Sequence, residues 1–138
     1  MDNEQKIFKP VEEWISQAEY DIDTGFQMLD GGRYIYAIFM SHLALEKMLK
    51  GVYVFYLKSY PPRTHNLVLL HERIEAKYKL NLNDEQNDLI EFLNEKSVPS
   101  RYPDVLAKVL EEFKRDETTT IVNNVKELIQ CLKNQLKV

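Results

Sequence analysis

The sequence predicts an all-α protein, an antiparallel up-and-down helical bundle of four to five main helices with one further short helix. Three observations predict this class. Apolar residues recur with the helical period of 3.6 along most of the chain, persuasive alternating strand patterns are absent, and short breaks rich in Pro or Gly separate the periodic segments. With 138 residues, the chain fits a single domain spanning 1–138.

The first helix is predicted to follow Pro10, which suits a first helical turn, and to continue to Leu29. The run Asp30-Gly31-Gly32 then ends it, because glycine accepts the dihedral angles of a C-cap. So short a break predicts that the next helix returns antiparallel. Ala18 and Gly25 fall on the expected contact face, and their small size predicts a close approach of the two helix axes.

The second helix, from Arg33 to Lys58, is predicted to be the centre of the bundle. It has no proline and is apolar on two nearly opposite sides, so other helices are expected to pack on both. Only a narrow sector carrying Lys47, Lys50 and Lys58 is expected to face water. Because this apolar surface exceeds what one small bundle readily covers, we expect a homodimer with a twofold axis.

Two shorter helices are predicted next. The break at Ser59-Tyr60-Pro61-Pro62 precedes a third helix over residues 65–78, for which Thr64 is the expected N-cap. A fourth helix is predicted to begin at Asn83 or Asp84 and to extend through Leu93.

The rest of the chain is predicted to be a stiff loop, a short helix and a long helix. Pro99 and Pro103 preclude a regular helix in the loop, and apolar spacing over residues 106–113 indicates the short helix. Asp116 or the threonines at 118–120 are the expected caps of the last helix, whose apolar stripe extends to Leu136.

Composition excludes several classes of protein. A hydrophobic fraction of 44% and a charged fraction of 29% are typical of a folded domain, and the net charge of −4 disfavours general binding to nucleic acid or anionic membranes. The single cysteine, Cys131, rules out an intramolecular disulfide and a cysteine zinc site. The first residues lack a signal-peptide pattern, and no apolar run approaches the roughly 20 residues of a membrane span. We therefore expect a cytoplasmic protein without a membrane partner.

The most unusual residues of the central helix are His42 and Glu46, one turn apart on an apolar face. This spacing can place two metal ligands together, with Asp21 of the first helix as a third, but a metal site in a bundle needs further carboxylates. In the alternative interpretation His42 forms a hydrogen bond with Glu46 or Asp21 and holds the bundle in register. We favour the structural interpretation and expect no metal and no cofactor.

A second group of residues lies in the predicted loop. Pro99 and Pro103 stiffen the backbone around Arg101, whose guanidinium can make a bidentate contact with a carboxylate or a phosphate. Tyr102 offers a ring on which a base can stack, and Asp104 is a potential cap of the short helix. Two interpretations stay open: a ligand site, or a salt bridge from Arg101 to the bundle, for example to Glu46.

The order of several motifs resembles the HEPN domain family. The residues that carry the resemblance are Trp14, Ala18 and Asp21; Gly32-x-Tyr34 and Ala37; Ser41-His42-x-Ala44-x-Glu46-Lys47-x-Leu49-Lys50; Pro62-x-Thr64-His65-x-Leu67; and Arg101-Tyr102-Pro103-Asp104. The resemblance implies an antiparallel helical bundle, usually a homodimer, with the central helix and the Arg101 loop at the interface. Many members are encoded beside a minimal nucleotidyltransferase as toxin–antitoxin pairs, and the active members are metal-independent RNA endonucleases.

The sequence departs from the nuclease members of this family at one point. Their motif is an arginine and a histidine separated by four to six residues, whereas Leu106, Ala107 and Lys108 occupy the corresponding places after Arg101. Without that imidazole, no residue of the motif is available for proton transfer. We therefore interpret the chain as a non-catalytic, dimeric binding module that pairs with a minimal nucleotidyltransferase and binds nucleotide or RNA.

The residues expected to contact such a ligand are Arg101, Tyr102, Asp104, Lys47 and Lys50. The alternative function is a metal-independent RNA endonuclease toxin whose divergent site consists of Asp21, His42, Glu46 and Arg101. A second alternative is a helical scaffold without a ligand.

Overall fold

The computed structural model describes residues 9–96 and 112–136. Within these ranges it contains five helices and no strand, so the predicted all-α class is confirmed. The helices are α1 (Val11–Asp30), α2 (Tyr34–Leu57), α3 (Leu67–Glu75), α4 (Asp84–Lys96) and α6 (Arg115–Leu136). None of the helices in this part of the chain is both long enough and apolar enough to cross a membrane.

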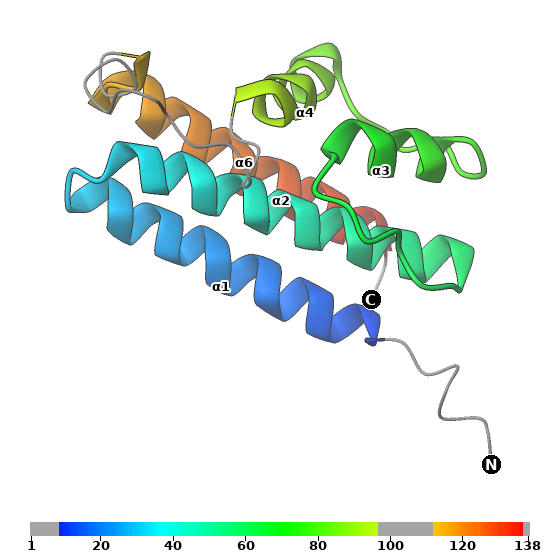
Figure 1. The fold of residues 1–138 in the computed structure, drawn as a ribbon. Coiled ribbons are helices and arrows are strands. Elements are labelled where there is room, and N and C mark those ends of the chain that lie inside the picture. The colour runs from blue at the N-terminus through cyan, green and yellow to red at the C-terminus, as the bar shows by residue number, and fades with distance from the viewer. Residues whose placement is uncertain (1–8, 97–111, 137–138) are drawn as a thin grey trace.

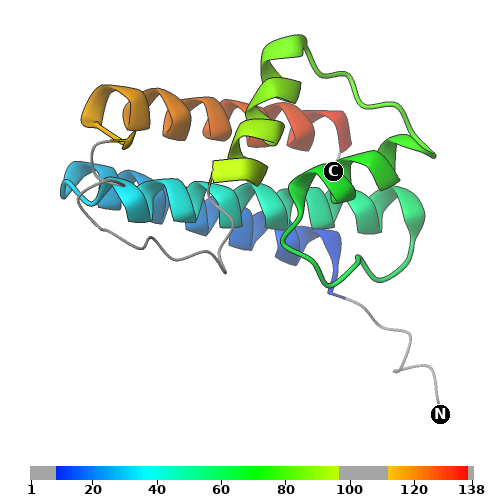
Figure 2. The ribbon, with the colours of Figure 1, turned by 45° about the horizontal axis from the view of Figure 1, so that its top comes forward.

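The three long helices α1, α2 and α6 lie side by side, and α1 runs opposite to the other two (Figures 1 and 2). The shorter helices α3 and α4 pack on the side of α2 and α6 away from α1, and they return the chain so that α6 runs in the same direction as α2. Helix α2 contacts all four of the other helices, which confirms that it packs on both sides. Its fully buried Leu45, Met48 and Leu49 form the middle of the core.

The turn between α1 and α2 has the predicted form. Gly31 is the C-cap of α1, and Gly32 adopts a φ of +76°, which favours glycine. Ala18 and Gly25 are buried, and the neighbours of Gly25 are residues of α2, but the tightest approach of the two helices lies at another glycine. A Cβ added at Gly25 would come no closer than 3.5 Å to a neighbour, whereas one at Gly51 would lie 2.9 Å from the Cβ of Trp14. Gly51 of α2 is therefore the glycine that this helix pair requires.

The start of α3 differs from the prediction, whereas the start of α4 agrees with it. Asn66, not Thr64, caps α3, because its side-chain oxygen accepts from the backbone N–H of Leu69 at 2.9 Å. At α4 the predicted cap Asn83 is observed. Its Oδ1 accepts from the N–H of Gln86 at 2.8 Å, and the Gln86 side chain accepts from the N–H of Asn83 at 3.0 Å.

Helix α6 begins at Arg115, earlier than expected, so the threonines do not cap it. Thr118 is buried, while the hydroxyls of Thr119 and Thr120 donate to carbonyls four residues back within the helix. The predicted apolar stripe of this helix faces the core, where Val125, Leu128, Ile129, Leu132 and Leu136 are buried. The expected Arg101 loop and all of the short helix except its last residues, 112–113, lie outside the described residues.

Candidate functional site

Polar side chains are buried in the middle of α2, which is otherwise apolar. Glu46 is the centre of this group, and we call Glu46, His42, Lys50 and His65 the Glu46 cluster. His42, Glu46 and Lys50 follow one another at four-residue spacing, so the helix itself places them along one side. His65 comes from the segment that leads from α2 to α3.

The Glu46 carboxylate has a partner on each oxygen. Oε2 lies 2.9 Å from Nζ of Lys50, and Oε1 lies 2.9 Å from Nδ1 of His65. The Glu46 side chain is only 6% exposed, so these contacts replace the water that the charge would otherwise need. The cluster thereby ties the segment before α3 to the central helix.

His42 is fully buried, as predicted, but its hydrogen-bond partners differ from the predicted ones. Its Nε2 lies 3.0 Å from the backbone carbonyl oxygen of His65, and its Nδ1 lies 3.3 Å from that of Leu93 in α4. Oε1 of Glu46 is farther away, at 3.8 Å from Nε2. His42 therefore lies against α4 and against the backbone before α3, in place of the predicted partners Glu46 and Asp21.

The environment of His42 sets its protonation state. Burial lowers the pKa of His42 below its ordinary value of 6.5, and the His65 carbonyl and the Glu46 charge offset only part of this effect. At neutral pH the ring is therefore neutral and carries one N–H. The shorter contact assigns that proton to Nε2, which donates to the His65 carbonyl oxygen.

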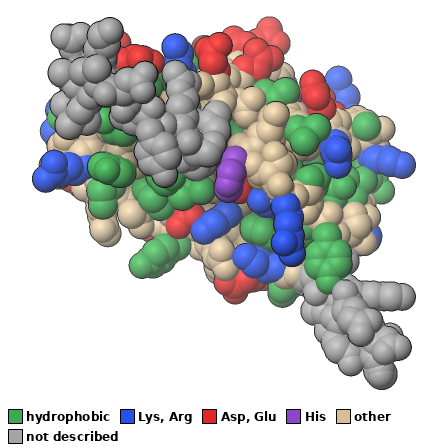
Figure 3. All heavy atoms as spheres, in the orientation of Figure 1, with side chains coloured by type: hydrophobic (Ala, Val, Ile, Leu, Met, Phe, Trp, Pro, Cys, Tyr) green, Lys and Arg blue, Asp and Glu red, His purple; other side chains and the backbone are tan. Residues whose placement is uncertain are grey.

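His65 combines a fixed position with access to solvent. Its side chain is 54% exposed, while Nδ1 is held by Glu46. Figure 3 shows a histidine side chain on this face, next to several Lys and Arg side chains and below the acidic groups along the upper edge. His65 was noted from the sequence only as part of a motif, and its contact with Glu46 was not predicted.

Asp21, the expected partner of His42, is paired with another residue. It forms a separate ion pair with Lys47, in which Oδ2 and Nζ are 2.7 Å apart. Lys47 and Lys50 were expected to face water, but their side chains are only 27% and 12% exposed, each against a carboxylate. Among the described residues, no group of three or more His, Cys, Asp or Glu side chains is placed to hold a metal ion.

The remaining predicted ligand contacts, Arg101, Tyr102 and Asp104, lie outside the described residues. Their proximity to the Glu46 cluster stays a prediction, as does the salt bridge from Arg101 to Glu46.

These features define a class: an all-α bundle whose central helix carries a paired, buried polar cluster. The sequence matches the HEPN domain family over residues 11–135, and the chain belongs to this family.

Two solved structures are similar to this chain. ST0689, described as an archaeal HEPN homologue, is 28% identical with a TM-score of 0.69, and the match covers 94% of this chain and 99% of that one. TT1696 from Thermus thermophilus is 19% identical with a TM-score of 0.73 over 90% of this chain and 96% of that one, which supports the fold alone. The comparison with curated proteins finds no significant match.

Proposed function

We propose that this HEPN domain is a dimeric binding module without nuclease activity, that its ligand is a nucleotide or RNA, and that its protein partner is a minimal nucleotidyltransferase. The observation that carries the proposal is the state of His42 and Glu46. Both are engaged in contacts that hold the bundle together, and His42 has no exposed surface.

Cleavage of RNA without a metal requires a group that takes a proton from the ribose hydroxyl in the transition state. A general base must come within hydrogen-bond distance of that proton, which a fully buried His42 cannot do. The histidine that follows the motif arginine in the nuclease members of the family is also absent, because residues 106–108 are Leu, Ala and Lys. Binding without cleavage is therefore the activity that these residues support best.

The proposed ligand surface includes Lys47 and Lys50 on α2 and the loop residues Arg101, Tyr102 and Asp104. Each of the two lysines already neutralises a carboxylate, so neither offers a whole positive charge to a phosphate. Affinity must then come mainly from Arg101 and from stacking on Tyr102. We expect binding that is weak and that falls as salt is added.

Family membership and the exposed surface together suggest how two copies of the chain associate. Helix α2 is largely covered by the other helices of its own chain, so little of it is available to a second copy. Its Tyr36, together with Tyr20 of α1, is prominently exposed, and we propose that these rings take part in contacts between chains. Light scattering at micromolar concentration tests the dimer, and a monomer would contradict it.

The central experiment combines RNA cleavage and RNA binding on purified wild type and Arg101→Ala. We expect no appreciable cleavage by either protein, and binding by the wild type that Arg101→Ala loses at an unchanged melting temperature. A lowered melting temperature, with no wild-type binding to lose, would assign Arg101 to the fold and overturn the ligand proposal. Identification of the neighbouring gene tests the nucleotidyltransferase partner.

One observation favours the endonuclease as a second candidate. Glu46 holds Nδ1 of an exposed imidazole, which is the arrangement in which a carboxylate orients a histidine for general acid–base catalysis through its other nitrogen. In that case His65, rather than His42 or Asp21, is the base. Wild-type cleavage that His65→Ala abolishes, without loss of RNA binding, would establish this candidate and refute the binding module.

A further inference from the structure

A pocket of about 580 Å³ lies where the C-terminal ends of α2 and α3 meet, and its residues are distinct from the Glu46 cluster. We call it the tyrosine pocket. The residues that matter for its chemistry are Tyr53, Tyr56, Tyr78, Ser59, Arg73 and Lys77. Among the described residues no acidic side chain lines it, although acidic residues outnumber basic ones in the chain by 22 to 18.

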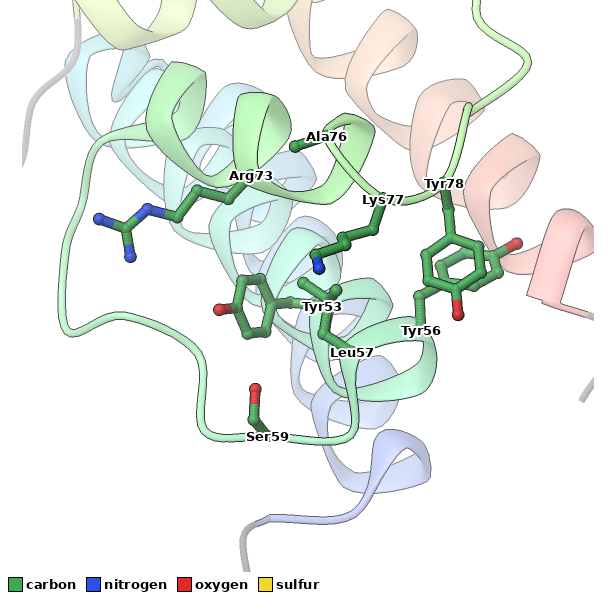
Figure 4. Close-up of a pocket in the computed structure, with 8 residues that line it drawn as sticks. All are labelled: Tyr53, Tyr56, Leu57, Ser59, Arg73, Ala76, Lys77 and Tyr78. Atoms are coloured by element: carbon green, nitrogen blue, oxygen red, sulfur yellow. The ribbon is translucent and has the colours of Figure 1, made fainter.

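One wall of the tyrosine pocket is aromatic. The rings of Tyr56 and Tyr78 are stacked, with centroids 4.6 Å apart and an angle of 24° between their planes. Tyr78 comes from the turn after α3 and is 45% exposed, so it presents ring surface to solvent beyond the stack (Figure 4). A planar group of a ligand can extend the stack on that surface, and such stacking contributes about 1–3 kcal/mol per base in proteins that bind single strands.

The other side of the pocket carries hydrogen-bond donors that the fold does not use. Arg73 and Lys77 are four residues apart, and the side chain of neither forms an ion pair or a hydrogen bond with the described residues. The same holds for the hydroxyls of Tyr53 and Ser59. In Figure 4 the Arg73 guanidinium and the Tyr53 hydroxyl extend to the same side of the view. Two cations and two hydroxyls, with no carboxylate, suit an anion.

The ends of the helices oppose anion binding to some extent. The C-terminus of a helix carries the equivalent of about half a negative charge, and both α2 and α3 end beside the pocket. Arg73 and Lys77 together supply two positive charges, so the net potential stays positive. The affinity is expected to be modest and to decrease with ionic strength.

We propose that the tyrosine pocket binds a nucleoside 5′-phosphate, with its base stacked on Tyr78 and its phosphate held by Arg73 and Lys77. The same chemistry is offered by a free mononucleotide and by the 5′-phosphorylated end of an RNA strand. This site goes beyond the proposed function and does not depend on it, because the ligand surface there consists of Lys47, Lys50 and the Arg101 loop.

The test is a titration of the protein at low salt, followed by calorimetry, with four separate probes: AMP, adenosine, inorganic phosphate and a short 5′-phosphorylated RNA. We expect saturable binding of AMP and much weaker binding of adenosine and of phosphate, since each lacks half of the contacts. Lys77→Gln and Arg73→Gln should each weaken AMP binding about tenfold, the loss typical of one charge-assisted contact. Tyr78→Leu should weaken it by a similar factor.

Lys79→Gln is the matched control, because Lys79 is an exposed lysine two residues from Lys77 and does not line the pocket. It should leave AMP binding unchanged. Equal loss in Lys77→Gln and Lys79→Gln would show general charge attraction and overturn the proposal, as would no AMP binding by the wild type. If the protein binds the RNA only when the RNA carries a 5′-phosphate and only when Lys77 is present, the ligand is the 5′-phosphorylated end of an RNA strand. Loss in Arg101→Ala alone would refute this pocket while leaving the proposed function intact.

Discussion

The Glu46 cluster and the tyrosine pocket use the same kinds of side chain in opposite ways. In the cluster, the lysine and both histidines are matched with a carboxylate or a backbone carbonyl of the chain itself. In the pocket, Arg73 and Lys77 have no such partner among the described residues. The middle of α2 is thus joined to its neighbours by polar contacts, and its C-terminal end presents donors to solvent.

Because of this difference, substitutions in the two regions should have separate effects, on folding stability in one and on ligand binding in the other. A buried charge that loses its partner destabilises the folded state, whereas an exposed charge contributes little to folding. Substitutions in the Glu46 cluster should therefore lower stability, and substitutions in the tyrosine pocket should change only binding. The predictions below test this contrast, beginning with the largest expected effect.

Glu46→Ala should be the most damaging single change, with a loss of about 3 kcal/mol in the free energy of unfolding. It leaves the largely buried Lys50 without its carboxylate and releases His65 from α2. Glu46→Gln is the control that keeps the shape of the side chain, and it should cost clearly less. Urea denaturation measures both, and equal stability of Glu46→Ala and wild type would show that the cluster does not hold the fold.

His42→Ala should lower the free energy of unfolding by about 1–3 kcal/mol, because the hydrogen bond from Nε2 to the His65 carbonyl is lost and the buried ring is removed from its place beside α4. Chemical denaturation at pH 7.5, where the ring is neutral in both states, measures this loss. A variant as stable as the wild type would contradict a structural role for His42.

The stability of the wild type should also depend on pH through His42. Because burial lowers the pKa of His42 in the folded state, the unfolded chain takes up a proton first as the pH falls through about 6.5. Stability should therefore decrease below that pH, by up to about 1.4 kcal/mol per pH unit, until the lowered pKa is passed. Glu46 and His65 face the same ring, so the His42→Gln variant is needed to isolate its share of the slope. An unchanged slope in that variant would contradict the assignment.

His65→Ala should cost less, about 0.5–1.5 kcal/mol, because its imidazole is half-exposed and only its contact with Glu46 is lost. The backbone carbonyl that His42 contacts is retained in this variant. Thermal melting measures the effect, and a loss as large as that of Glu46→Ala would mean that His65, rather than Lys50, is the main partner of the carboxylate.

Arg73→Gln and Lys77→Gln should change the free energy of unfolding by less than about 0.5 kcal/mol each, the range of ordinary surface substitutions. A larger loss would indicate that these cations stabilise the C-terminal ends of α2 and α3. That result would remove the contrast between the pocket and the cluster.

Most of the fold could be predicted from the sequence because it follows from local signals. The glycine turn, the apolar stripes of α2 and α6 and the Asn83 cap all depend on residues close together in the chain. The cap of α3 was misplaced because Thr64, Asn66 and their neighbours offer competing hydrogen bonds. Thr64 accepts from the N–H of Asn66 at 3.0 Å, which forms a turn just before the helix.

The candidate site was predictable only in part. Burial of His42 and Glu46 followed from their place on an apolar face, but their partners come from distant segments that periodicity does not bring together. The contact of Gly51 with Trp14 and the meeting of Tyr56 with Tyr78 are likewise contacts between elements. The spacing of Arg73 and Lys77, four residues apart, is the one signal of the pocket that the sequence itself contains.

In the Glu46 cluster, His42 is neutral and structural, and it does not take part in ligand binding or catalysis. The most direct test is an NMR titration of the histidine side-chain nitrogens. We expect His42 to carry its single proton on Nε2 at pH 7 and to titrate with a pKa below the ordinary value of 6.5. An imidazolium at pH 7, or titration of His42 at or above 6.5, would contradict it.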